Sequence, residues 1–125
     1  MDTRRKILSP DAAPPPDAPR PVALVTGYFD ILRVDHAREL ADVRTSTGAA
    51  TLVVLVLPLP GELMPQPARA RMVAALRVVD YVITAENGQV DRLIARFGPA
   101  AVVRLEAADA QRRRALVEHA QRRQT

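Results

Sequence analysis

The chain has 125 residues, a formal net charge of +4 at pH 7 and no cysteine. This length suits one domain, and the lack of thiols excludes disulfides and cysteine-ligated zinc or iron–sulfur sites. No apolar run approaches the roughly 20 residues that span a bilayer, and no apolar segment follows the basic residues at 4–6, so a secretory signal is not expected. We therefore expect a cytoplasmic protein with no membrane partner.

All basic residues other than Lys6 and the two histidines are arginines. An arginine excess is compatible with nucleic-acid binding, but it also arises when arginines occupy solvated helix faces. The few aromatic residues do not interleave with the arginines to stack on bases, which favours the second interpretation. We expect no nucleic-acid partner.

The first 21 residues are expected to form a stiff, exposed leader that stays outside the domain. Six of the eleven prolines lie between Pro10 and Pro21, and proline has no amide hydrogen to donate to a helix or a sheet ladder. The chain therefore divides into a proline-rich flexible leader, residues 1–21, and one domain, residues 22–125.

Strand and helix signals alternate along the domain. Short apolar runs predict strands at 22–26, 51–57, 80–84 and 101–105. Helical periodicity predicts helices at 34–44, 68–77, 90–97 and 109–123. The proline-rich residues 58–67 are expected to form a loop, and Gly98 with Pro99 is expected to end the third helix.

This order of elements predicts an α/β fold. Alternating units of this kind form a three-layer, Rossmann-like domain, in which a parallel sheet of about four strands carries helices on both faces. In such sheets ligands bind beyond the carboxyl ends of the strands, at the point where the strand order reverses. The loop after the first predicted strand is a natural place for a ligand.

That loop, T-G-Y-F-D-I-L-R-V-D-H at 26–36, has residues suited to an anion. Gly27 permits close approach of a ligand to the backbone, and the Asp30 carboxylate could cap the following helix. His36 falls in the first turn of that helix, where free N–H groups favour an anion. Arg33 offers a planar fork of donors for phosphate oxygens. The alternative is that Arg33 and His36 are ordinary exposed loop residues.

Residues 27–36, G-Y-F-D-I-L-R-V-D-H, resemble the signature G-x-F-D-x-x-H-x-G-H of the cytidylyltransferase-like nucleotidyltransferases. This family includes glycerol-3-phosphate cytidylyltransferase and heptose-1-phosphate adenylyltransferase. Residues 69–80, R-A-R-M-V-A-A-L-R-V-V-D, are similar to a second segment of the family, an arginine and an apolar helix before Val-Asp and a strand. The resemblance covers about residues 22–105.

The resemblance implies a nucleotidyltransferase that uses CTP or ATP, with Mg²⁺, and a small phosphorylated metabolite such as a sugar or polyol phosphate. Pyrophosphate would be released, and catalysis would be electrostatic. A homodimer is a further expectation from the family. The implied catalytic residues are Arg33 and His36, with no protein-ligated metal. The implied nucleotide- and phosphate-binding residues are Thr26, Gly27, Tyr28, Phe29 and Arg69.

The sequence departs from the family pattern in four places. Arg33 replaces the first histidine, and Asp35 replaces the glycine. A carboxylate about 5 Å from a phosphate costs roughly 3 kcal/mol at an effective dielectric near 20, unless it turns away, pairs with an arginine or binds magnesium. The loop at 58–67 has no lysine, and no Ser-Thr-Thr motif follows the last strand. Two hypotheses stay open: an enzyme with impaired activity, or a non-catalytic nucleotide-binding or assembly module.

Overall fold

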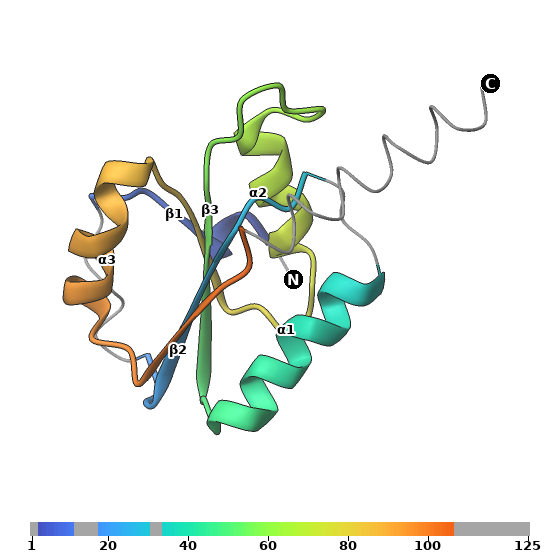
Figure 1. Ribbon diagram of the computed structural model, residues 1–125. Coiled ribbons are helices and arrows are strands. Elements are labelled where there is room, and N and C mark those ends of the chain that lie inside the picture. The colour runs from blue at the N-terminus through green and yellow to red at the C-terminus, as the bar shows by residue number, and fades with distance from the viewer. Residues whose placement is uncertain (1–2, 12–17, 31–33, 107–125) are drawn as a thin grey trace.

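In the computed structural model, which describes residues 3–11, 18–30 and 34–106, parallel strands form one sheet between two layers of helices (Figure 1). The sheet has five strands in the order β1-β4-β3-β2-β5. The strands are β1 (Ile7–Leu8), β2 (Val22–Gly27), β3 (Thr51–Val56), β4 (Tyr81–Thr84) and β5 (Ala101–Arg104). The helices are α1 (Val34–Thr47), α2 (Gln66–Ala74) and α3 (Val90–Phe97), with short 3₁₀ helices η1 (Thr3–Lys6) and η2 (Asn87–Gln89).

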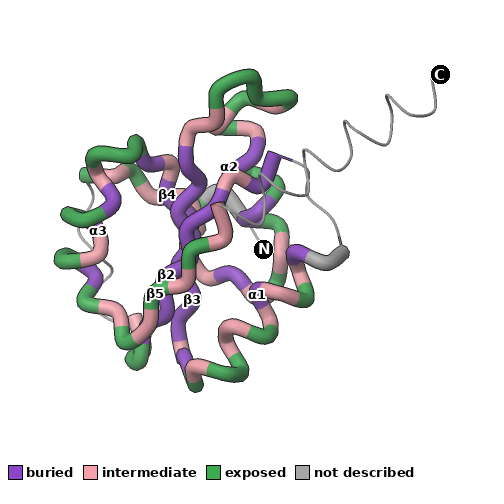
Figure 2. The backbone as a smooth tube through the Cα atoms, viewed as in Figure 1, coloured by how far each residue is buried: buried purple, intermediate pink, exposed green. Residues whose placement is uncertain are grey.

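The helices cover opposite faces of the sheet because the order in which the chain adds strands reverses at β2. From β2 to β3 to β4 the chain advances toward one edge, so right-handed crossovers place α1 and α2 on the same face. It then returns past β2 to β5, which places α3 on the other face (Figure 1). The central strands β2 and β3 are buried along their whole length (Figure 2).

Two apolar cores result, one on each face. Leu40 of α1 and Val73 of α2 pack with Val25 and Val54 on one face. Leu93 of α3 packs with strand residues of the opposite parity on the other face. This arrangement confirms the predicted Rossmann-like α/β fold, and the alternation is the period of two that a strand imposes on its side chains.

The prediction that the leader stays outside the sheet is wrong for Ile7 and Leu8. Ile7 pairs with Val82 and Leu8 pairs with Ile83, so β1 adds a fifth strand beside β4. Ile7 packs against the core beneath α1 and α2, whereas Leu8 packs against the core beneath α3. The prediction relied on the prolines, which begin only at Pro10, and a two-residue strand is too short for its pattern to be recognised.

The helix boundaries differ modestly from the prediction. Helix α2 begins at Gln66, two residues before the predicted start, with Pro67 in its first turn. Proline is tolerated there because the first amides of a helix have no intrahelical partner. Helix α3 has the predicted bounds and ends at Gly98 in the left-handed conformation, φ 56°. The helix predicted at 109–123 lies outside the described residues.

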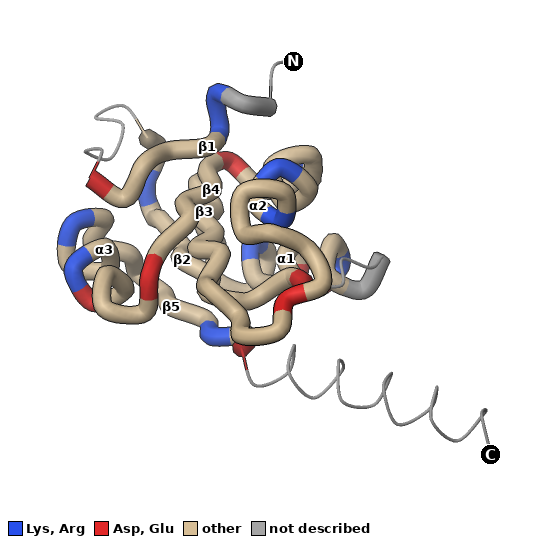
Figure 3. Tube along the Cα trace, turned by 90° about the horizontal axis from the view of Figure 1, so that it is seen from above, with Lys and Arg blue, Asp and Glu red and all other residues tan. Residues whose placement is uncertain are grey.

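Several arginines are anchored on main-chain carbonyls. Arg20 donates to the carbonyls of Phe97 and Gly98, just after α3. Arg44 donates to the carbonyls of Ala50 and Val78. For Arg44, which lies in α1, the expectation of an arginine on a solvated helix face is therefore incomplete, because its guanidinium also binds main-chain carbonyls. Figure 3 shows the described basic residues spread over several elements, among them α1, α2, α3 and the end of β5.

Candidate functional site

The loop after β2 lies where the strand order reverses. Strand β2 is flanked by β3 and β5, and the chain leaves it toward α1 on one face while α3 covers the other. Because all pairs are parallel, the carboxyl ends of the strands meet at one edge of the sheet. This is the place where open α/β sheets bind ligands.

Not all of the predicted loop can be placed. Arg33, one of the two predicted catalytic residues, lies outside the described residues. Asp35 is the second residue of α1, but its side chain also lies outside the description. The described part of the loop ends at Asp30 and resumes with α1, whose first turn contains His36 as expected.

The end of β2 has a buried polar atom for which the described residues provide no hydrogen-bond partner. The Thr26 side chain is 0% exposed, and its hydroxyl has no hydrogen-bond partner in the described part of the chain. One carboxylate oxygen of Glu106, just beyond β5, is buried in the same way. The two residues are close along the sheet, because Thr26 pairs with Arg104 and its carbonyl accepts from the amide of Leu105. A buried polar group without a partner is a natural contact for a bound ligand.

Phe29 holds an unusual backbone conformation directly after the strand. Its φ is 53°, in the left-handed region that non-glycine residues rarely adopt. The ring is buried and lies against the imidazole of His36, with the ring centroids 5.4 Å apart. Such strain persists only where the surroundings fix it, and it is common at functional sites.

His36 is buried as well, with a relative exposure of 2%. It is therefore not the exposed loop residue of the alternative interpretation. The structure places its ring against that of Phe29, which lies two residues after β2.

Asp30 fixes a second loop to this one. Its carboxylate accepts hydrogen bonds from the backbone amides of Leu63 (3.0 Å) and Met64 (3.1 Å). These residues belong to the loop between β3 and α2, which was predicted at 58–67. The buried carboxylate thereby joins the two loops that follow β2 and β3. Whether it also caps α1 depends on residues outside the description.

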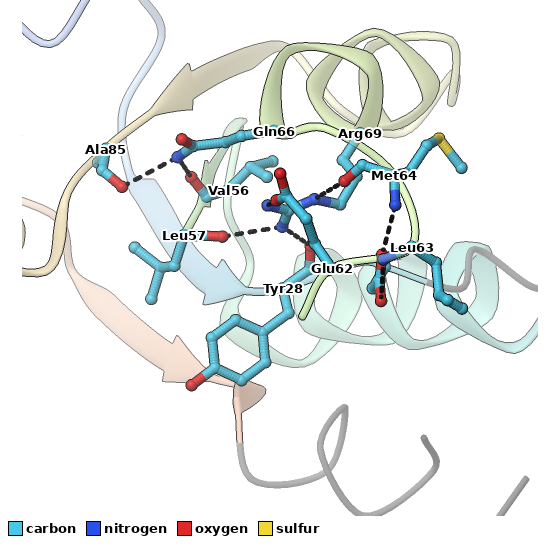
Figure 4. Close-up of polar contacts among 10 residues, drawn as sticks. Tyr28, Val56, Leu57, Glu62, Leu63, Met64, Gln66, Arg69 and Ala85 are labelled. Carbon is cyan, nitrogen blue, oxygen red and sulfur yellow. Dashed lines mark hydrogen bonds and ion pairs between the residues drawn. The ribbon is translucent and has the colours of Figure 1, made fainter. Parts of the chain in front are cut away.

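Arg69 forms the centre of the polar contacts at this edge (Figure 4). Its Nε donates to the Met64 carbonyl (3.0 Å), and its Nη1 donates to the carbonyls of Tyr28 (2.6 Å) and Leu57 (2.8 Å). Its Nη2 pairs with the Glu62 carboxylate at 2.6 Å. The Arg69 side chain is 0% exposed. The guanidinium therefore binds protein groups on every nitrogen, and through them it ties the ends of β2 and β3 to the loop before α2.

Gln66 lies one turn before Arg69 and extends the same network. Its side-chain amide donates to the carbonyl of Val56 (2.8 Å), at the end of β3, and to that of Ala85 (3.1 Å), just after β4. The first turn of α2 thus binds the carboxyl ends of the central strands through two side chains on one face, as Figure 4 shows.

Two residues of this network were not predicted from the sequence. Gln66 could have been noticed from its spacing of three residues from Arg69, which places both side chains on one helix face. Nothing in the sequence indicates Glu62, because it lies in a proline-rich loop without periodicity. Only the fold of that loop brings its carboxylate to Arg69.

The described residues contain no group of three or more His, Cys, Asp or Glu side chains that could hold a metal ion. None of the described helices is long and apolar enough to cross a membrane.

No protein-family model and no curated protein matches the sequence. Among solved structures, the chain is similar to the lipopolysaccharide core biosynthesis protein from Thermoplasma volcanium GSS1. The TM-score is 0.58 and the sequence identity is 23%, over 65% of this chain and 70% of that chain. At this identity the likeness shows a shared α/β fold.

Proposed function

We propose that this chain is a nucleotidyltransferase-like protein that transfers a nucleotidyl group from CTP or ATP to a small phosphorylated metabolite. A phosphate oxygen of the acceptor would form a bond to the α-phosphorus of the nucleotide. The bond from that phosphorus to the β-phosphate oxygen would break, and pyrophosphate would leave with the electron pair. A sugar or polyol phosphate is the acceptor class that the family resemblance suggests.

One observation supports this proposal most. The stretch 26–36, which carries the resemblance, follows the central strand β2 at the point where the strand order reverses, and ligands bind at that point in open α/β sheets. The strained Phe29 lies three residues after Thr26, whose buried hydroxyl has no hydrogen-bond partner among the described residues. The similar solved structure is named as a biosynthesis protein of the lipopolysaccharide core, which is in keeping with a phosphorylated sugar as acceptor.

The proposed roles follow the chain. Backbone groups of Thr26, Gly27, Tyr28 and Phe29 cradle the nucleotide. Arg33 and His36 donate to its phosphates and stabilise the charge that develops in the transition state. Arg69 contributes positive charge from beneath the loop, where its guanidinium is already held by three main-chain carbonyls.

Mg²⁺ belongs in this proposal as part of the nucleotide substrate. The described residues do not gather a protein-built metal site, and the Asp30 carboxylate already accepts two backbone amides. Mg²⁺ usually keeps several waters and binds through substrate phosphates with one or two carboxylates at most. The chain's own residues would therefore bind the phosphates, and the ion would accompany them.

The alternative is a non-catalytic nucleotide-binding or assembly module. The burial of both His36 and Arg69 favours it, as does Asp35 at the position where the family has glycine. In this alternative the site binds a nucleotide but turns it over slowly or not at all. A homodimer would suit either function and remains part of the proposal.

Ligand-dependent stability tests the proposal directly. A ligand that binds only the native state raises the free energy of unfolding by about 2.7 kcal/mol at a concentration of 100 times its Kd. We expect CTP or ATP with Mg²⁺, at millimolar concentration, to raise the melting temperature, and pyrophosphate release to follow when a phosphorylated acceptor is added. If neither nucleotide changes the melting temperature, both the enzyme and the nucleotide-binding module are excluded.

Asp35→Gly tests whether Asp35 weakens nucleotide binding. Removing the carboxylate at this position of α1 should tighten nucleotide binding, since one repulsive pair with a phosphate about 5 Å away costs roughly 3 kcal/mol. Isothermal titration of the variant and of the unmodified chain compares the two affinities. A weaker affinity in the variant would mean that Asp35 is itself a ligand contact.

A further inference from the structure

The Glu62–Arg69 ion pair differs from the other contacts of Arg69. Nε and Nη1 donate to main-chain carbonyls of Met64, Tyr28 and Leu57, which are neutral groups fixed by the backbone. Among the described residues, the one charged side chain that Arg69 contacts is that of Glu62, through Nη2. The guanidinium is therefore fixed in position by its carbonyl partners, while its charge is compensated by a separate group.

Burial places Glu62 between Arg69 and the solvent. The Arg69 side chain is 0% exposed, whereas the Glu62 side chain is 36% exposed. Glu62 lies in the run from Pro60 to Leu63, where every residue is exposed. In Figure 4 the Glu62 side chain reaches from the loop to the guanidinium. Rotation of this one side chain would open the Nη2 end of Arg69 to a ligand.

Such a rotation leaves the rest of the loop in place. The amides of Leu63 and Met64 stay bound to Asp30, and the Met64 carbonyl stays bound to Nε of Arg69. The backbone on the C-terminal side of Glu62 is thus anchored independently of the ion pair. The carboxylate is the part of the loop that can exchange at the smallest structural cost.

A buried guanidinium needs an anion beside it. Removing one partner of a buried ion pair leaves an uncompensated charge and is strongly destabilising, so Glu62 can depart only when another anion takes its place. Phosphate oxygens suit this position because they match the planar donors of arginine, and hydrogen bonds between charged partners are the stronger ones. A neutral ligand would not satisfy the same requirement.

We propose that Glu62 holds the place of a ligand phosphate, and that a phosphate or pyrophosphate group replaces its carboxylate at Nη2 of Arg69. This inference rests on the proposed function, in which a nucleotide binds at the same edge of the sheet. It explains how a residue expected to neutralise phosphate can be fully buried. Glu62 thereby sets a threshold for binding, because an incoming anion competes with an internal carboxylate.

Pyrophosphate titration of the full chain tests the exchange. Glu62→Gln keeps an oxygen acceptor near Nη2 but removes the competing charge, so pyrophosphate should bind at least tenfold more tightly than to the unmodified chain. The matched control is Glu86→Gln, which makes the same change in net charge at an exposed glutamate after β4. Its affinity for pyrophosphate should stay within twofold of the unmodified chain.

A second measurement does not depend on the variant's affinity. In the unmodified chain the side-chain N–H resonances of Arg69 should shift on addition of pyrophosphate, as its partner changes. Glu62→Gln should also melt at a lower temperature than Glu86→Gln. Addition of pyrophosphate should raise the melting temperature of Glu62→Gln and so remove this difference. Equal or weaker binding by Glu62→Gln, or unchanged Arg69 resonances at saturation, would overturn the exchange.

Failure of the Glu62 exchange can be told apart from failure of the proposed nucleotide binding. If CTP or ATP raises the melting temperature but Glu62→Gln binds pyrophosphate no better, the exchange is wrong and nucleotide binding stands. If Glu62→Gln gains affinity for pyrophosphate while neither nucleotide binds, the anion site is real and the nucleotide assignment is wrong. If neither chain binds pyrophosphate, the exchange is excluded.

Discussion

The ring of Phe29 packs against the imidazole of His36, with centroids 5.4 Å apart and planes inclined by 57°. Seven positions separate these residues, and the loop between them includes residues outside the description. Phe29 has a positive φ and is buried, so its side chain helps to hold both the strained strand exit and the first turn of α1. The contact therefore couples the conformation of the loop to the position of the histidine.

Phe29→Ala tests this coupling. Truncation of a buried phenylalanine usually costs about 3–5 kcal/mol, and alanine does not relieve the positive φ. We expect a loss of about 3 kcal/mol in the free energy of unfolding, measured with urea, and a changed environment of the His36 ring in NMR spectra. Leu63→Ala is the control, because Leu63 is 70% exposed and should change stability by less than about 0.5 kcal/mol. Similar losses in both variants would contradict a specific role for Phe29.

Asp30→Ala tests the link between the two loops. The buried carboxylate accepts from the amides of Leu63 and Met64, and an unsatisfied buried donor costs about 1–3 kcal/mol. We expect hydrogen exchange at these two amides to become at least tenfold faster. Asp30→Asn should give an intermediate rate, since one side-chain oxygen remains. Asp42→Ala, at an exposed position of α1, should leave both rates unchanged; slow exchange in Asp30→Ala would mean that the loop is held by other contacts.

Thr26→Val addresses the buried hydroxyl at the end of β2. Because this hydroxyl has no partner in the described part of the chain, its replacement by a methyl group should raise the free energy of unfolding by about 1 kcal/mol. Nucleotide affinity should fall if the hydroxyl contacts the ligand, as proposed.

Thr51→Val is the matched control for this substitution. Thr51 is also buried in a strand, but its hydroxyl donates to the Pro19 carbonyl at 2.6 Å. Its loss should lower the free energy of unfolding by about 1 kcal/mol. If both valine variants are destabilised equally, the Thr26 hydroxyl has a partner of its own within the protein.

Ile7→Asp tests whether β1 is an integral strand of the domain. Ile7 pairs with Val82 and packs against the core beneath α1 and α2, so an unpaired carboxylate there should lower the free energy of unfolding by about 2 kcal/mol. Ser9→Asp introduces the same charge at the exposed residue just after the strand, and we expect an effect below about 0.5 kcal/mol. A chain that tolerates Ile7→Asp equally well would be stable without β1.

The central part of the fold follows from the sequence alone. The run 51–57 is apolar at every position after Thr51 and therefore predicted a strand buried on both faces, and its pairing with β2 places it at the centre of the sheet. The last residue of helix α3 was predicted correctly from Gly98, because glycine takes the left-handed conformation that ends a helix without strain. These features depend on local periodicity and on backbone preferences, which the sequence expresses directly.

Other features were decided only by the tertiary structure. Ile7 and Leu8 form a strand because β4 offers a free edge, and a two-residue segment has no periodicity of its own. Arg69 could be singled out in the sequence, but its four partners come from three separate segments of the chain. Glu62 has no local signature at all. Glu62 and Arg69 are only seven positions apart, but their pairing depends on how the proline-rich loop folds beside the carbonyls of Tyr28 and Leu57, and hydrophobic packing of the whole domain determines that fold.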